Sequence, residues 1–587
     1  MALNTEIVDV DTDVLVIGGG LAGCMAAIKA RESNLSVTIA EKANTLASGC
    51  AGSGIDHMWA YIPEVHEPMG YTMDDMADNH VRVVARGFVN RDILRLVIED
   101  SYQRMLDLEK FGLKFRFEDS KQPGKFRVVH QFHALPDTFN FEGRRVKVYL
   151  TKEAKRRGAK IYNRVNMTEL LTTADGHVAG ALGYGTRDGR IYRFRAKAVV
   201  TSTGRVNRLN KTWTDVWGNH RIPVSETGDG RAMAYRAGAK IINMEFLSPA
   251  RFSIGNFELN LGSPRNTVQP AGSVVDGNGR VIVPRTQFYP WETLDKGKVD
   301  VPAVIARHME STAKTHLNYH KLMMEGQGPF YLDLTGGTEE EINYIEWSIS
   351  HEGKGSLFLE HLHNQVGFDF RKDKLEWLPN SREMAGTASS GLLVDKNLES
   401  NIKGLYAAGD EVGGVPWSAS PGAFTMGWKA GENAAKEAAS MKALPEAAPE
   451  TLERLDQFVH EAKSARGGQH WREVELAVQN IVDHYAGNHR AEKMLERGLT
   501  RLAELRELIR FHAANPHETG HCLEVNSLLD NAEMVLRGSR ERKESRLAPF
   551  GFMRADYPEP NDAEFFNFLA QQKNGKGANF SKVALPR

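Results

Sequence analysis

Residues 13–42 read DVLVIGGGLAGCMAAIKARESNLSVTIAEK and decide the fold of the first part of the chain. An apolar run ends at Gly18-x-Gly20-x-x-Gly23, a stretch rich in small residues follows, and a second apolar run ends at Glu41. This order predicts a β-α-β unit whose tight glycine turn lets a pyrophosphate approach the backbone at the start of the helix. Glu41 lies 18 positions after the last glycine, where an acidic side chain accepts a hydrogen bond from a ribose hydroxyl. The stretch therefore predicts a dinucleotide site rather than an ordinary glycine-rich turn.

The composition describes a globular protein with material for several cores. The chain has 587 residues, of which 41% are hydrophobic and 25% charged. A formal net charge of −1 favours neither nucleic acid nor an anionic membrane surface as a partner. The sequence has neither a long apolar run nor a basic segment followed by an apolar one, so we expect no membrane span, no secretory signal and, by default, a cytoplasmic location. Cys24, Cys50 and Cys522 are too far apart for a metal or iron–sulfur site.

Turn signals and helical periodicity divide the chain into segments. Strand-like and helix-like stretches alternate at first, and they include a meander over 160–195. Turn signals then become dense, regular α/β texture returns, and Pro445 with Pro449 marks a linker. Helical periodicity dominates beyond the linker, and the polar, basic tail is expected to be extended with little to bury. We therefore divide the chain into parts at 1–246, 247–382, 383–442 and 450–587.

Three later motifs indicate that the predicted dinucleotide is FAD. They are a strand over 199–204, ETGDGRAMAYRAGA over 226–239, and GLYAAGDEVGG over 404–414. In the last motif a buried strand delivers Gly409-Asp410 to a helix start, where the carboxylate can hold a ribityl chain and free N–H groups can face the flavin pyrimidine. A lone AAGD marks a helix N-cap equally well, but the four pieces in this order favour a flavin site. The residues expected to bind the cofactor are Gly18, Gly20, Gly23, Glu41, Lys42, Ser48, Gly49, Thr203, Gly204, Asp229, Gly409 and Asp410.

These motifs, with ESRLAPFGFMRADYPE over 544–559, resemble the flavoprotein family of succinate dehydrogenase, fumarate reductase, aspartate oxidase and adenylylsulfate reductase. The resemblance covers nearly the whole chain. It implies an α/β fold, in which a Rossmann-like FAD-binding domain is interrupted by an α+β capping domain and followed by a C-terminal helical domain. The active site would lie between the FAD domain and the cap, over the isoalloxazine ring. The family's membrane-bound dicarboxylate enzymes attach FAD covalently through a histidine; that position falls near Ala47 here, which implies non-covalent FAD.

Four stretches that handle dicarboxylates in the family are changed in this chain. The family's histidines and arginines are missing from SPA at 248–250, VQPAG at 268–272, GTASSGLL at 386–393 and VPWSASPGAF at 415–424. A buried carboxylate without a partner is costly, so the resemblance disfavours fumarate and succinate as substrates.

The adenylylsulfate reductase α branch of the family fits better. WTDVW at 213–217 and PARF at 249–252 resemble its Trp-x-x-Val-Trp and Pro-Ala-Arg-Phe segments. The resemblance makes Trp213 a stacking wall for a nucleotide and Arg251 an anion ligand, and these two are the candidate catalytic residues. The alternative is a core aromatic residue and a surface ion-pair partner. The branch's histidine before Cys-Cys-Gly falls at Gly386, so one polar contact is missing.

Three other histidines can be weighed as proton donors, because an imidazole titrates near neutrality. They are His130, His133 and His308. A surface or hydrogen-bonded structural role is favoured for each of them.

The sequence therefore predicts an FAD-dependent oxidoreductase subunit that reduces a small oxyanion-bearing substrate at flavin N5. In the family, the reduced flavin attacks the sulfur of a sulfonucleotide. Because this chain has no cluster ligands, the resemblance implies electrons from a separate iron–sulfur subunit. One alternative is a fumarate-reductase-like flavoprotein acting on an organic C=C or CH–CH bond other than that of fumarate. Another is a flavoprotein that serves mainly as an assembly or electron-relay partner.

Overall fold

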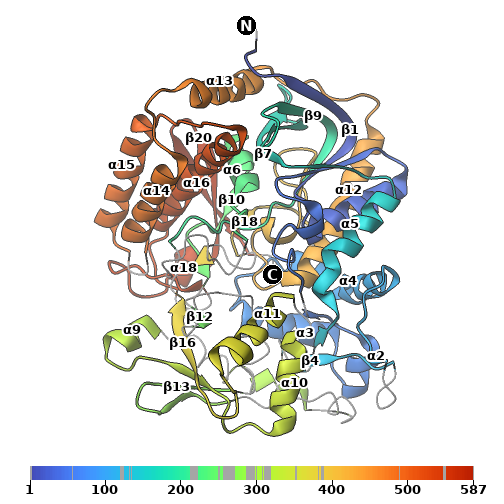
Figure 1. Cartoon of the computed structure of the whole chain (residues 1–587), viewed down its shortest axis with the longest axis vertical. Coiled ribbons are helices and arrows are strands. Elements are labelled where there is room, and N and C mark those ends of the chain that lie inside the picture. Colours follow the sequence, from blue (N-terminus) through green and yellow to red (C-terminus); the bar gives the residue numbers. More distant parts are fainter. Residues whose placement is uncertain are drawn as a thin grey trace.

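The structure is a computed structural model, and Figure 1 shows the whole chain. The described residues are 3–585 apart from 56, 119–123, 131–132, 134, 136, 212–222, 249–250, 255–271, 286–297, 299, 304, 307–308, 310–318, 351–352, 381–382, 385–388, 488–489 and 547–549. Within these residues, no helix combines the length and the apolar character that crossing a membrane requires.

A seven-stranded sheet carries the predicted β-α-β unit. Its order is β6-β2-β1-β9-β8-β7, with β19 also paired to β9. The strands are β1 (Ile7–Ile17), β2 (Val37–Glu41), β6 (Lys160–Asn163), β7 (Val165–Thr172), β8 (Val178–Gly185), β9 (Ile191–Thr201) and β19 (Leu405–Ala407). β1 runs parallel to β2 and β9, and β7, β8 and β9 form the predicted antiparallel meander. The carboxyl ends of the parallel strands therefore meet at one edge, where ligands bind in such sheets.

Two helices pack closely against each other beside this sheet. They are α1 (Leu21–Ala30) and α12 (Ala419–Ser440). A Cβ atom at Gly427 would lie 2.3 Å from the Ala22 carbonyl oxygen, and one at Gly431 would lie 2.2 Å from that of Ala26. Only glycine allows this approach, so the two helices are fixed relative to each other.

The inserted cap has its own sheet and core and lies at the bottom of Figure 1. Its five-stranded sheet has the order β12-β16-β15-β13-β14. The strands are β12 (Arg251–Ile254), β13 (Ser273–Val275), β14 (Val281–Val283), β15 (Tyr331–Asp333) and β16 (Leu375–Asn380), and the helices are α9 (Tyr319–Met324), α10 (Glu339–Ser350) and α11 (Gly353–His361). The chain enters the cap along β11 (Leu247–Ser248) and leaves along β17 (Glu383–Met384), and these two short strands pair with each other.

A small three-stranded sheet and several helices complete the first part of the chain. The sheet has the order β3-β5-β4. Its strands are β3 (His57–Trp59), β4 (Val128–His130) and β5 (Thr138–Asn140). The helices are α2 (Pro63–His66), α3 (Met73–Asn79), α4 (Arg91–Lys110), α5 (Val146–Arg156) and α6 (Asp229–Arg236), and α3 continues into a π-helical turn, His80–Val84.

The C-terminal region is helical, as its periodicity predicts, and it ends in a hairpin. The helices are α13 (Glu450–Ser464), α14 (Trp471–Tyr485), α15 (Glu492–Leu508), α16 (Pro516–Glu541) and α18 (Asp562–Phe565). β20 (Asn567–Asn574) and β21 (Gly577–Ala584) extend a sheet that also holds β10 (Ile241–Ile242) and β18 (Gly391–Leu392). The tail expected to be extended, residues 571–587, forms the end of β20 and all of β21, and of its described residues only Gln571 is buried.

Candidate cofactor and active site

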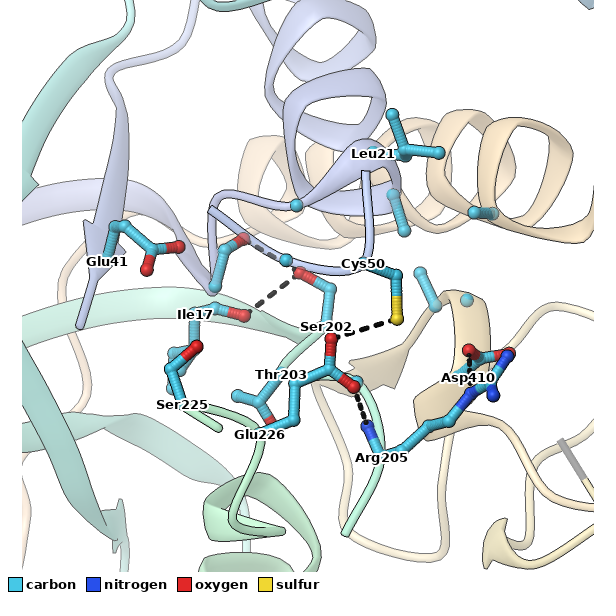
Figure 2. A pocket seen from close by; sticks show the side chains of 18 of the residues that line it. Ile17, Leu21, Glu41, Cys50, Ser202, Thr203, Arg205, Ser225, Glu226 and Asp410 are labelled. Carbon is cyan, nitrogen blue, oxygen red and sulfur yellow. Dashed lines mark hydrogen bonds and ion pairs between the residues drawn. The ribbon is translucent and has the colours of Figure 1, made fainter. Parts of the chain in front are cut away.

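A cavity opens at the carboxyl ends of β1, β2, β9 and β19 (Figure 2). Residues from all four sequence motifs line it, although the motifs lie far apart in the chain. Ten of the twelve residues predicted to bind the cofactor are among them: Gly18, Gly20, Glu41, Lys42, Gly49, Thr203, Gly204, Asp229, Gly409 and Asp410.

The glycine turn between β1 and α1 has the geometry that a pyrophosphate needs. Gly18 has φ +92°, and a Cβ atom at Gly23 would lie 1.9 Å from its carbonyl oxygen. At Gly20, by contrast, a Cβ atom would meet no protein atom within 4 Å. Gly20 is the N-cap of α1 and carries no side-chain cap, so the first N–H groups of the helix face open space.

Three side chains around the turn hold it in shape. Glu41 accepts hydrogen bonds from the backbone N–H groups of Gly19 (2.7 Å) and Ala43 (2.6 Å). The Ser48 hydroxyl donates to the Gly19 carbonyl oxygen (3.3 Å), as does the Lys147 ammonium group. Gly23 and Ser48 are thus placed beside the turn and not on the cavity wall. Lys147, which is 1% exposed, was not predicted, because nothing near it in the sequence marks this contact.

A cluster of three charged side chains, Lys42, Asp229 and Glu524, joins the cavity to the C-terminal region. Lys42 Nζ lies 2.7 Å from Asp229 Oδ2 and 2.9 Å from Glu524 Oε1. Burial alone would lower the pKa of Lys42, but the charges of Asp229 and Glu524 outweigh burial and raise it above its ordinary value. Glu524 belongs to α16, so a helix that the sequence assigned to another domain stabilises this wall.

A row of polar side chains lies along another wall, joined by dashed lines in Figure 2. The Cys50 thiol donates to Glu226 Oε1 (3.0 Å), the backbone N–H of Arg205 donates to Glu226 Oε2 (3.1 Å), and Arg205 Nε lies 2.6 Å from Asp410 Oδ2. Only Asp410 was predicted. Arg205 directly follows the motif 199–204 and Glu226 is the first residue of the motif 226–239, and these positions are the signal that could have found them.

The environment of Cys50 predicts low reactivity. Burial, followed by the charge of Glu226, raises the pKa of the thiol well above its ordinary value. We therefore expect iodoacetamide at pH 8 to alkylate Cys50 of the apoprotein at least ~10-fold more slowly than free cysteine, as measured by peptide mass mapping. Glu226→Gln removes one charge that raises this pKa and should speed the reaction. Alkylation at the rate of free cysteine would contradict the expectation.

An unpaired polar atom on the cavity wall fits FAD, as the glycine turn does. Among the described residues that line the cavity, Asp229 has a buried Oδ1 atom without a hydrogen-bond partner. Ser418 is the N-cap of α12, which has no side-chain cap, and Ala419 and Ser420 at the start of that helix line the cavity. Hydroxyl and imide groups of a flavin cofactor can satisfy such atoms.

The structure describes the two candidate catalytic residues less fully than the predicted cofactor-binding residues. Trp213 and His308 lie outside the described residues. Arg251 begins β12, where it pairs with Asn380 of β16, and its backbone alone is described. The segment that follows the cap is anchored near the cavity, because Arg231 donates to Ser390 Oγ (3.0 Å) and to the Asp410 carbonyl oxygen (2.7 Å).

Family models and curated relatives match nearly the whole chain. A model described as an FAD binding domain matches residues 13–426, and one described as the C-terminal part of fumarate reductase flavoprotein matches residues 475–584. One of the fumarate reductase (CoM/CoB) subunits of Methanothermobacter marburgensis is 25% identical over 572 residues, which cover 94% of this chain and 95% of that protein. L-aspartate oxidase of Yersinia pestis is 24% identical over 584 residues, which cover 93% of this chain and 96% of that protein.

Solved structures share the fold. Adenylylsulfate reductase from Archaeoglobus fulgidus superposes with a TM-score of 0.84 at 23% identity, covering 100% of this chain and 97% of that one. Quinol fumarate reductase from E. coli has a TM-score of 0.79 at 19% identity, and the match covers 98% of this chain and 97% of that one. The predicted fold class and the predicted cofactor, FAD, are confirmed. The chain belongs to the FAD-binding flavoprotein family that includes fumarate reductase, and it is an FAD-dependent oxidoreductase.

Proposed function

We propose that the chain is the flavin-bearing subunit of a reductase that delivers electrons from flavin N5 to a small oxyanion-bearing substrate. One observation carries this proposal: the strand pair at the base of the cap is tied to the cavity wall, and β12 with Arg251 begins directly after that pair. β11 and β17 pair where the chain enters and leaves the cap, and Ser390, shortly after β17, is bonded through Arg231 to Asp410. This arrangement supports a substrate site between the cap and the flavin.

The residues of the chain have separate tasks in this proposal. Bound FAD supplies two-electron reduction at N5. The glycine turn and the start of α1 bind the pyrophosphate, and Ala47, at the family's attachment position, leaves the flavin non-covalently held. A guanidinium at Arg251 would bind an oxyanion bidentately and keep it within reach of the ring.

Electrons reach the flavin from a separate iron–sulfur protein in this proposal. The described residues contain no group of three or more histidine, cysteine or acidic side chains that could hold a metal, and the three cysteines lie far apart in the sequence. The Methanothermobacter relative is one subunit of its fumarate reductase, which supports a multi-subunit arrangement. Co-purification of a small iron–sulfur protein with the chain would support this electron donor.

Two additions to the purified flavoprotein test the proposed substrate class. Bleaching of oxidised flavin by sulfite plus AMP, beyond that caused by sulfite alone, supports a sulfonucleotide-type oxyanion. Reoxidation of reduced flavin by a small enoate supports the alternative, reduction of an organic C=C bond, which the fumarate-reductase relatives favour. If neither addition changes the flavin and no small oxidant is turned over, the chain acts as an electron-relay or assembly partner, and the reductase proposal fails.

Arg251→Ala should raise the substrate KM about 10-fold, because a charge-assisted pair contributes roughly 1.5 kcal/mol. The flavin content should stay at the wild-type level, since the cavity walls lie elsewhere. Arg251→Lys keeps the charge but loses the bidentate geometry. Its substrate KM should lie between those of the wild type and Arg251→Ala. Steady-state kinetics of the three proteins measure the effect, and an unchanged KM for Arg251→Ala would remove this residue from the substrate site.

A further inference from the structure

Residues 415–419, here called the strap, form a strained connection at the start of α12. Trp417 has φ +64° and Ala419 has φ +46°, although neither is glycine. Side chains with a Cβ atom rarely adopt such backbone angles, and they persist only where the surroundings impose them. Ser418, between the two, is fully buried. Something must therefore hold the strap in place.

Two side chains from other elements hold the strap by its carbonyl groups. His80, at the start of the π-helical turn, places its Nε2 atom 2.9 Å from the Pro416 carbonyl oxygen. Trp59, at the end of β3, donates from Nε1 to the Trp417 carbonyl oxygen (3.1 Å). Both contacts act on the residues at or just before the strained positions.

His80 is itself fixed by a buried chain of hydrogen bonds. The Pro416 carbonyl only accepts, so His80 carries a proton on Nε2. Burial, followed by the neighbouring His133, lowers the pKa of His80 to about 3, so its Nδ1 is unprotonated and accepts from His133 Nε2 (3.0 Å). His133 Nδ1 is bonded in turn to Asp137 Oδ2. All three side chains are 0% exposed, so the tautomer and the ring orientation of His80 are determined.

The strap determines where the start of α12 points. Ala419 and Ser420 line the cofactor cavity, and the helix has no side-chain cap, so its first N–H groups and its positive end face the cavity. Negative charge that develops on a reduced flavin ring is stabilised by such a helix end, provided the N–H groups are held in place.

We propose that His80, held by His133 and Asp137, is a positioning residue that keeps the start of α12 directed at the flavin ring and thereby increases the reactivity of N5. The inference rests on the FAD that the family shows and on the ring lying beside α12. It does not depend on which substrate the enzyme reduces or on its electron partner.

Sulfite alone tests this proposal, because it adds to N5 of oxidised flavins without substrate or partner. Its sulfur lone pair forms the bond to N5, the flavin takes up the electron pair as negative charge, and the absorbance of the oxidised flavin is lost. His80→Ala should raise the sulfite dissociation constant about five-fold and shift the midpoint potential of bound FAD to a more negative value. His80→Gln should restore much of the affinity, since its amide can still donate to the Pro416 carbonyl.

His66→Ala is the matched control. His66 is also fully buried, but its Nδ1 is bonded to the backbone of Ile62 beside its own helix and not to the strap. This variant should keep the wild-type sulfite affinity and potential, which separates the effect of the strap contact from loss of a buried imidazole.

An unchanged sulfite dissociation constant and potential in flavin-loaded His80→Ala would overturn the proposal. If that variant does not take up FAD, Trp59→Phe decides, because it retains an aromatic ring and removes the hydrogen bond to the Trp417 carbonyl. A shift of about two- to three-fold in the same direction is then expected, and no shift overturns the proposal. If sulfite does not bleach the wild-type flavin, the midpoint potentials of the same variants test the proposal on their own.

Discussion

Gly20→Ala should weaken FAD binding roughly 100-fold, because an added methyl group keeps the pyrophosphate from the N–H groups at the start of α1. The apoprotein should remain as stable as the wild type. A Cβ atom at this position meets no protein atom within 4 Å, and its φ of −66° suits alanine. Fluorescence titration of apoprotein with FAD, together with thermal melting of the apoprotein, measures both parts.

Two further glycines sharpen this experiment. Gly336→Ala is the control, since a Cβ atom there also has open space, in a turn of the cap far from the cofactor motifs in sequence. Gly23→Ala should destabilise the apoprotein as well, because the new atom would lie 1.9 Å from the Gly18 carbonyl oxygen. If Gly20→Ala binds FAD as the wild type does, the pyrophosphate does not lie at this turn.

Arg542→Met should lower the free energy of unfolding by about 3–5 kcal/mol, because it leaves the buried carboxylate of Glu245 without a counter-charge. Arg542 Nε lies 2.6 Å from Glu245 Oε1 and its Nη1 lies 3.0 Å from Glu544 Oε1, and all three side chains are fully buried. Arg542 also donates to the Phe565 carbonyl oxygen (2.8 Å). Denaturant unfolding followed by far-UV circular dichroism measures the change.

Arg540→Met is the matched control for this prediction. Arg540 pairs with Glu492 and Glu496, but its side chain is 45% exposed, so its loss should cost no more than about 1 kcal/mol. Adding Glu245→Gln to Arg542→Met should restore part of the stability by removing one unpaired charge. A loss of less than about 1 kcal/mol for Arg542→Met would show that Glu245 finds another partner.

Features encoded by neighbouring residues could be predicted from the sequence. The β-α-β unit, the meander that turns at Gly176 and Gly189, and the helices beyond the linker all follow local periodicity and turn chemistry. The predicted glycines and acids collect around one cavity because parallel strands end at a common edge. The proposed domain limits and the roles of the individual side chains stay predictions.

Contacts between distant segments could not be predicted. Cys50 and Glu226 are 176 positions apart, and neither belongs to a motif with a fixed spacing to the other. The terminal hairpin likewise bonds to a distant segment, since Asn243 lies 326 positions before Leu569. No local pattern encodes such pairings, because the side chains meet only after both segments have folded.

The bridge from Lys42 to Glu524 bears on when this wall of the cavity is completed during synthesis. A nascent polypeptide has made the whole glycine turn long before α16 is translated, yet one wall of the cavity depends on an acid from that late helix. A ribosome-bound chain that stops short of residue 524 therefore presents Lys42 without this counter-ion. We therefore expect the full charge arrangement of this wall only after α16 has packed against Lys42.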